Sequence, residues 1–202
     1  MRKPKDPLSL LTIFLDKAQR SLRGIYEFSS DPECVYRLSI EKAPRDVVLP
    51  DGTELHKGEP VGIIHLWGEH MPVIPSSGIN LAWASRMARV LEKSAGLLAQ
   101  HAVRETSLQS IPAFGNDVFL PPSSVRLLER IGYAVLEGTS RHTLCGRLRI
   151  WIVRRWTWLL RRAFNRESAR GIAPADLQYI SIWISRRALF KKYGDSSGVG
   201  SA

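Results

Sequence analysis

The sequence contains only two cysteines, Cys34 and Cys145, among its 202 residues. Zinc knuckles need clusters of cysteine or histidine ligands, and two isolated cysteines do not supply one. A disulfide framework is not needed either, because a chain of this length with 44% hydrophobic residues can build its own core. We therefore expect two free thiols used for packing, no metal site, and a cytoplasmic location in a reducing compartment.

The sequence also lacks a long hydrophobic run. No stretch approaches the roughly 20 apolar residues that a membrane-spanning helix needs. A basic N-terminus leads into an apolar run from Leu8 to Leu15, but Asp16 interrupts that run and no small-residue cleavage site follows. We interpret residues 8–27 as an amphipathic first helix rather than as an export signal or a transmembrane segment.

Three common catalytic motifs are absent. The chain has no Gly-x-x-x-x-Gly-Lys-Ser/Thr loop, no Gly-x-Gly-x-x-Gly and no Gly-x-Ser-x-Gly elbow. Their absence disfavours P-loop enzymes, dinucleotide-binding enzymes and hydrolases of the nucleophile-elbow type. No internal repeat is present, and the sequence leaves open whether the protein is an enzyme at all.

The periodicity of the apolar residues predicts a mixed α/β (α+β) fold with a sheet of about four to five strands covered by helices. We expect one domain over residues 1–194, with a C-terminal helical pair at 143–193 and a disordered tail at 195–202. Gly132 is expected to end a helix as its C-cap. The expected helices cover residues 8–27, 79–104, 121–130, 143–166 and 176–193, and the expected strands cover 34–40, 61–67, 110–114 and 133–136.

Positive charge is concentrated in one segment. The net charge is +10, and residues 141–166 contain eight arginines and no acidic residue. A helical wheel of this segment separates an apolar arc from a basic arc. The apolar arc contains Ile152, Val153, Trp156, Leu159, Leu160, Ala163 and Phe164. The basic arc contains Arg147, Arg154, Arg155, Arg161 and Arg162, with Trp151 and Trp158 in its middle.

Two main interpretations of this basic arc remain open. In the first, arginine stems pack over the tryptophans and the face is simply solvated. In the second, the arc binds an anionic lipid surface or an acidic partner, because exposed tryptophan suits the membrane interface and arginine suits anionic headgroups. We disfavour nucleic acid as the partner. We favour a non-enzymatic role at the inner membrane surface, without a cofactor.

A second group of candidate residues follows two of the predicted strands. His65, Glu69 and His70 lie at the end of one strand, and Asp117 follows another. Strand ends often carry functional side chains in open sheets. The spacing matches neither common zinc motif, so the simplest interpretation is a core histidine with nearby loop residues. The alternative is a site for binding or acid–base catalysis.

Two stretches of the sequence resemble the YkoP-like domain, a bacterial family that is sometimes joined to polysaccharide deacetylase domains. The first runs from Leu49 to Pro60 and on into Ile64–Trp67, and the second covers Ile182–Leu189 and Lys192–Gly194. The family has no settled activity. The resemblance therefore implies only a cell-envelope or polysaccharide-related context, and the chain contains no deacetylase domain of its own.

The predicted order of elements is similar to that of the GNAT acetyltransferases, and Leu127–Val135 looks like the closing helix and strand of that fold. This resemblance implies an alternative function, a divergent acyltransferase that uses coenzyme A. Family members bind the cofactor's pyrophosphate on a Gln/Arg-x-x-Gly-x-Gly/Ala loop that opens the long helix. Here that position contains Ser77, Gly78 and Asn80 without the signature, although a helix N-terminus still offers free N–H groups to a phosphate.

Overall fold

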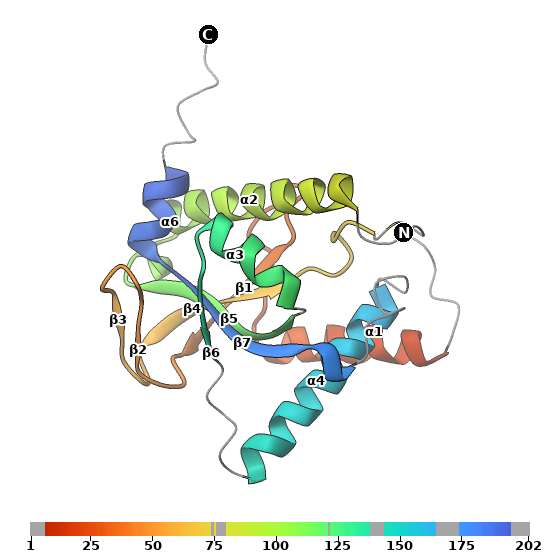
Figure 1. The fold of residues 1–202 in the computed structure, drawn as a ribbon. Coiled ribbons are helices and arrows are strands. Elements are labelled where there is room, and N and C mark those ends of the chain that lie inside the picture. Colours follow the sequence, from red (N-terminus) through yellow and green to blue (C-terminus); the bar gives the residue numbers. More distant parts are fainter. Residues whose placement is uncertain are drawn as a thin grey trace.

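A computed structural model describes residues 7–73, 75, 80–120, 122–137, 144–164 and 174–194 (Figure 1). A five-stranded mixed sheet forms its centre, in the order β1-β4-β5-β7-β6. The strands β4 and β5 are parallel, and every other neighbouring pair in this sheet is antiparallel. The bounds are β1 Tyr36–Lys42, β4 Pro60–Leu66, β5 Ala113–Leu120, β6 Ala134–Glu137 and β7 Gln178–Ser185. A separate small hairpin pairs β2 (Val47–Val48) with β3 (Glu54–Leu55).

Helices cover both sides of the sheet. Figure 1 shows α2, α3 and α6 on one side and α1 and α4 on the other. The bounds are α1 Pro7–Leu22, α2 Leu81–Arg104, α3 Val125–Ile131, α4 Leu144–Phe164 and α6 Arg186–Tyr193. Short 3-10 turns lie at Thr106–Leu108, Pro122–Ser124 and Pro174–Asp176. The predicted fold class, a mixed sheet covered by helices, is confirmed.

The main hydrophobic core lies on the α2 side of the sheet. Inward side chains such as Leu38, Ile64 and Phe114 pack there against the buried face of α2, which includes Val90 and Leu98. Each fully buried aliphatic or aromatic side chain of this kind contributes about 1.5–3 kcal/mol through removal from water. The sequence therefore places its largest apolar surface between the sheet and α2.

Gly132 ends α3 as predicted. Its φ of 105° is left-handed, and its N–H donates to the carbonyl groups of Leu128 and Glu129. Glycine reaches this conformation without the clash that a side chain would introduce. The prediction of a C-cap at this position is confirmed.

The predicted C-terminal helix at 176–193 is wrong in its first half. Residues Gln178–Ser185 form strand β7, which lies inside the sheet between β5 and β6. Isoleucine recurs at every second position here, at Ile180, Ile182 and Ile184, which is the period of a strand. β-Branched residues favour this conformation. The helix α6 begins only after Ser185, whose side-chain oxygen accepts from the Ala188 N–H as an N-cap. The expected helical pair is therefore one helix, a strand and a shorter helix.

Two other boundaries differ from the sequence prediction. The first helix ends at Leu22 rather than at residue 27, because Tyr26 forms a bridge with Leu38 in the first strand. The strand expected at 110–114 runs instead from Ala113 to Leu120. Ser77, Gly78 and the tail at 195–202 lie outside the described residues.

Candidate functional site

The sheet has a polar face opposite its hydrophobic core. Side chains alternate along each strand, so the residues between the core positions point to the other side. This polar face is covered by α1 and α4, which pack against each other. Its polar members are Arg37 and Ser39 on β1, His65 on β4, Asp117 on β5, and Tyr179 and Ser181 on β7.

Helix α1 turns its polar side toward this face of the sheet. Thr12 is only 2% exposed, and Asp16 and Arg20 are mostly shielded from solvent. In contrast, Phe14 is 68% exposed and Leu11 is 53% exposed. The helix is amphipathic as predicted, but its apolar side points away from the protein.

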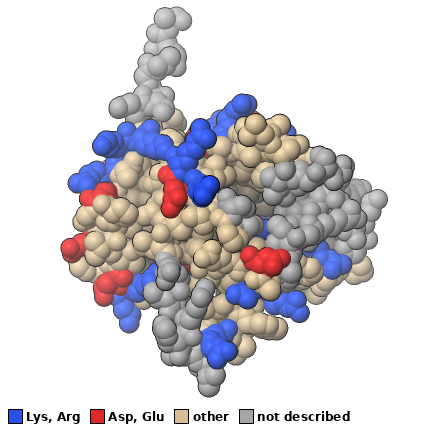
Figure 2. Space-filling view, in the orientation of Figure 1, with Lys and Arg blue, Asp and Glu red and all other residues tan. Residues whose placement is uncertain are grey.

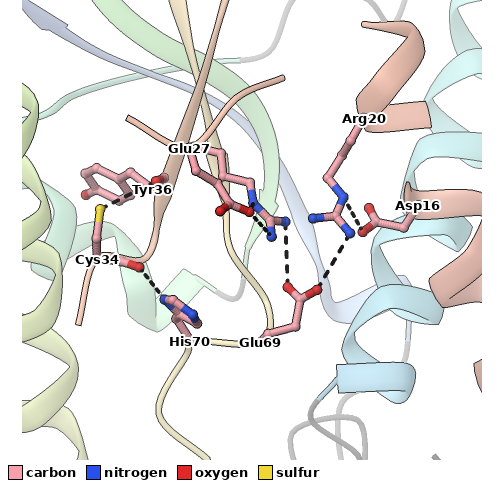
Figure 3. A network of polar contacts seen from close by, with 8 residues as sticks. Asp16, Arg20, Glu27, Cys34, Tyr36, Glu69 and His70 are labelled. Carbon is pink, nitrogen blue, oxygen red and sulfur yellow. Dashed lines mark hydrogen bonds and ion pairs between the residues drawn. The ribbon is translucent and has the colours of Figure 1, made fainter. Parts of the chain in front are cut away.

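Five side chains form a chain of ion pairs beneath α1. The carboxyl group of Glu69 lies between the guanidinium groups of Arg37 and Arg20, at 3.6 Å and 3.7 Å. Figure 3 shows Glu69 pointing toward Arg20 of α1. Arg37 also contacts Glu27 at 3.0 Å, and Arg20 contacts Asp16 at 3.1 Å. Glu69, one of the predicted catalytic candidates, therefore lies in a network that holds α1 on the sheet.

Burial changes the proton affinity of two members of this network. Removal from water disfavours the charged form of either group. Burial raises the pKa of the Asp16 carboxyl, and the nearby Arg20 partly opposes that change. Burial likewise lowers the pKa of Arg37, although Glu69 favours its charged form. The ion pairs offset part of the free-energy cost of burying these charged groups.

His65 is held by a hydrogen bond to Ser39, with its Nε2 atom 2.9 Å from the Ser39 hydroxyl oxygen. That hydroxyl donates its single proton to Glu41 at 3.1 Å. His65 must therefore donate its Nε2–H to Ser39, which is the reverse of a base that activates a serine nucleophile. Burial and the positive charge of Arg23 lower the pKa of His65 to about 4. This geometry gives His65 a structural role.

His70 points to a different part of the molecule. Its Nδ1–H donates to the Cys34 carbonyl at 2.9 Å, and its ring stacks on Trp67 with the centroids 3.6 Å apart. The guanidinium group of Arg37 lies 4.2 Å from the centre of the same Trp67 ring. Within the described ranges, no hydrogen bond or ion pair joins His65, His70 or Asp117 to one another, and no three potential ligands gather as a metal site.

Asp117 lies beneath α4 with two aromatic neighbours. Its Oδ2 atom accepts from the Tyr179 hydroxyl at 2.8 Å, whereas its Oδ1 atom is buried without a hydrogen bond. Tyr179 packs beside Phe119, and the guanidinium group of Arg154 lies 5.3 Å from the centre of the Phe119 ring. The Nε atom of Arg154 is also buried without a hydrogen bond.

The arginines of α4 differ in their exposure. Arg154 lies against the sheet, and Arg161, seven residues later on the same helix face, is mostly buried with a pKa lowered by that burial. Arg147, near the start of the helix, and Arg155 are exposed. The predicted basic arc is therefore exposed in part and packed in part.

The exposed side of α4 combines apolar and basic residues. Trp151 is 57% exposed and carries Arg155 over its ring at 5.8 Å. Ile152, which we expected to pack inward, is 53% exposed. Trp158 is half-buried beside Arg162. Figure 2 shows Lys and Arg side chains over the lower part of the molecule, where α4 lies.

We call the exposed sides of the two packed helices α1 and α4 together the outer face. Its apolar members are Leu8, Leu10, Leu11, Phe14, Leu15, Leu148, Trp151 and Ile152, and its exposed cations are Lys17, Arg147 and Arg155. We call the groups enclosed between the sheet and these two helices the polar layer. Its members are Thr12, Asp16, Arg20, Arg37, His65, Glu69, Asp117, Arg154 and Arg161.

The position of Asn80 was also predicted as part of a cofactor site. Its side-chain oxygen accepts from the Trp83 N–H at 2.9 Å, so it serves as the N-cap of α2. This contact uses the oxygen of Asn80 to stabilise the helix start.

Part of the polar layer could be predicted from the sequence. Arg37, Ser39 and Glu41 alternate with apolar residues in β1, which marks one polar strand face. The equivalent alternation in β7 was hidden because we predicted that segment to be helical. Nothing in the sequence paired Asp117 with Tyr179, which lies 62 positions away and reaches it only through the sheet.

Comparisons with protein-family models, curated proteins and solved structures returned no match. Within the described ranges, no helix is both long enough and apolar enough to cross a bilayer.

Proposed function

We propose that the protein docks on the surface of an anionic membrane through its outer face. The observation that carries this proposal is the orientation of α1, which covers Thr12, Asp16 and Arg20 while it exposes Leu11 and Phe14. Amphipathic helices bind membranes by placing their apolar side at the boundary between headgroups and acyl chains. The apolar side of α1 is already free to do so.

The charges around this surface favour anionic lipid over a second copy of the chain. Asp16 is the only acidic residue of α1 and it points inward, while α4 contains no acidic residue. The exposed charges, Lys17, Arg147 and Arg155, are therefore all positive. Two copies joined through the same surface would bring these charges together, whereas an anionic bilayer contributes about 1 kcal/mol of attraction for each cation near it.

Exposed aromatic residues add a second contribution. Phe14 and Trp151 lie on the two helices that form the outer face, and tryptophan is well suited to the headgroup region because its ring is amphipathic. Exposed apolar side chains gathered on two packed helices commonly mark an interaction site on a folded protein. Resemblance to the YkoP-like family would place this membrane in the cell envelope.

Vesicle co-sedimentation tests the proposal. We expect the protein to sediment with vesicles that contain phosphatidylglycerol and to remain in solution with phosphatidylcholine alone. Substitution of Phe14→Gln together with Trp151→Gln should reduce binding at least tenfold. The matched control, Val48→Gln with Val103→Gln, changes two exposed valines outside the outer face and should leave binding intact.

Two results would overturn this function. One is a failure of the unaltered protein to bind anionic vesicles. The other is an equal loss of binding in the control variant. If the protein instead forms a concentration-dependent dimer in light scattering, and the Phe14→Gln, Trp151→Gln variant abolishes the dimer without any lipid binding, the outer face is a contact between copies.

A divergent acyltransferase that uses coenzyme A is the second candidate function. The observation in its favour is the short pairing of β4 with β5, which covers only Gly62 with Phe114 and Ile63 with Gly115. Beyond this point the side chain of Asn116 spans the strands by donating to the Ile64 carbonyl at 2.9 Å. Crevices at the carboxyl ends of parallel strands commonly hold ligands. Saturable retention on immobilised coenzyme A, competed by free coenzyme A, would support it, and no retention would remove it.

A further inference from the structure

The polar layer contains every buried side-chain polar atom that lacks a hydrogen bond in the described part of the chain. These atoms are Arg20 Nε, Glu69 Oε2, Asp117 Oδ1 and Arg154 Nε. Native proteins keep few such atoms, and each calls for a specific explanation. Two of them are donors and two are acceptors, so a group that satisfies the layer must offer both kinds of hydrogen-bonding atom.

Asp117 and Arg154 are the least satisfied members. Arg20 Nε and Glu69 Oε2 still make ion pairs, at 3.1 Å to Asp16 and 3.6 Å to Arg37. Neither an ion pair nor a hydrogen bond reaches Asp117 Oδ1 or Arg154 Nε. Both groups lie beside the Phe119 ring, Arg154 above it and Asp117 two residues earlier on the same face of β5. Both groups lie where α4 faces β5, and no hydrogen bond or ion pair joins them among the described residues.

The α4 side of this space is strongly basic. Arg161 lies on the same helix face as Arg154 and is also taken out of water, and α4 provides no acid to neutralise either group. Guanidinium groups bind phosphate oxygens through paired N–H donors. Two such groups supply more donors than a single carboxylate needs, which favours a phosphate as the anionic group.

The strand side offers the opposite chemistry. Asp117 presents a free carboxyl oxygen, and the rings of Phe119 and Tyr179 lie next to it with their centroids 5.1 Å apart. A carboxyl group beside aromatic rings suits an ammonium ion, which can donate a hydrogen bond to the oxygen and lie against a ring face. An ammonium group with N–H bonds would donate to Asp117 Oδ1 and also balance the negative charge of the carboxylate.

We propose that the space between α4 and strands β5 and β7 binds a small ligand that carries a phosphate and a primary ammonium group. Arg154 and Arg161 hold the phosphate, and Asp117 accepts a hydrogen bond from the ammonium group. Such a ligand is either a soluble phosphorylated amine or the headgroup of a phosphatidylethanolamine lipid. This site uses the inward side of α4, so it does not depend on docking through the outer face.

Isothermal titration calorimetry with O-phosphoethanolamine as the probe tests the site. We expect saturable binding that is at least tenfold tighter than binding of phosphocholine, whose quaternary ammonium has no N–H to donate. Inorganic phosphate should also bind at least tenfold more weakly. Substitution of Asp117→Asn should remove the preference for the primary amine, and Arg154→Gln should weaken binding of all three probes.

Arg155→Gln is the matched control, because Arg155 neighbours Arg154 in sequence but is exposed. This change should leave binding of O-phosphoethanolamine unaltered. It should weaken binding to anionic vesicles, whereas Asp117→Asn should not. The two sets of variants therefore separate failure of the ligand site from failure of membrane docking.

The source of the ligand is resolved by one further probe, glycerophosphoethanolamine. Tight binding of O-phosphoethanolamine but not of glycerophosphoethanolamine assigns a soluble ligand, and binding of both assigns the lipid headgroup. No saturable binding of any probe, or no discrimination between O-phosphoethanolamine and phosphocholine, would overturn the proposal. These ligand comparisons use the unaltered protein and remain decisive if a variant misfolds.

Discussion

Individual side chains in the polar layer are arranged for structure rather than for the acid–base chemistry suggested by their residue types. His65 is the clearest example, because its Nε2–H donates to Ser39, which in turn donates to Glu41. Glu69 likewise contacts two arginines of the network under α1. A histidine and a carboxylate near a strand end predicted a possible site of chemistry, but the direction of each hydrogen bond depends on the neighbours that the fold provides.

The depressed pKa of His65 makes stability depend on pH. Its pKa is about 4 in the folded protein, below the usual histidine value of 6.5, so protonation opposes folding. Its contribution is complete above pH 6.5 and is lost as the pH falls toward 4. We expect the free energy of unfolding to fall by about 2 kcal/mol more in the unaltered protein than in His65→Gln between pH 7.5 and pH 5.

Urea unfolding at several pH values measures this difference. Glutamine can still donate to Ser39 but does not titrate, so His65→Gln isolates the charge of the imidazole from its hydrogen bond. Parallel pH profiles for the two proteins would show that His65 is not held neutral by burial.

At the scale of the elements, the spacing of apolar residues predicted helix or strand well. It was less successful in predicting which side of each element faces the core. The helix α2 was predicted to within two residues at its start, because its apolar residues recur at helical spacing and pack on the core. An apolar stripe on α1 was also predicted. The sequence could not show that this stripe points outward, because that orientation depends on the polar face of the sheet, which is assembled from four different strands.

The helix prediction for the segment that forms β7 was wrong for a related reason. Its apolar residues continue directly into the helical run that begins at Arg186, and the boundary is marked only by Ser185. A short apolar run of this kind fits a buried strand or a buried helix equally well. Its pairing with β5 and β6, residues far away in the sequence, decided the outcome.

The reversed orientation of α1 predicts opposite effects for substitutions on its two sides. Phe14→Gln removes a ring that solvent already surrounds, so the free energy of unfolding should change by less than about 0.5 kcal/mol. Arg20→Ala removes the ion-pair partner of Asp16 and leaves Glu69 with Arg37 alone, so it should cost about 2 kcal/mol. Chemical denaturation of the two variants measures both values, and a larger loss for Phe14→Gln would mean that the apolar side of α1 is the packed side.

For the molecule as a whole, the sheet separates two chemically different halves. One side is a hydrophobic core with α2. The other side has a smaller hydrophobic cluster near the β2–β3 hairpin and a charged layer closed by two helices with exposed apolar sides. Because exposed cations attract the anionic surface, vesicle binding should weaken at least fivefold between 50 mM and 500 mM salt, with the apolar contacts retaining the remainder.

Membrane docking requires that the outer face enter the lipid interface. An environment-sensitive fluorophore on that face can measure this insertion. We would attach nitrobenzoxadiazole to Phe14→Cys on the outer face and, separately, to Arg89→Cys on the opposite side of the sheet. Both variants would carry Cys145→Ala, while Cys34 can remain because it is buried and burial raises the pKa of its thiol. Anionic vesicles should increase and blue-shift the emission at position 14 and leave position 89 unchanged. An unchanged signal at position 14 while the protein binds vesicles, or an equal change at both positions, would contradict docking through the outer face.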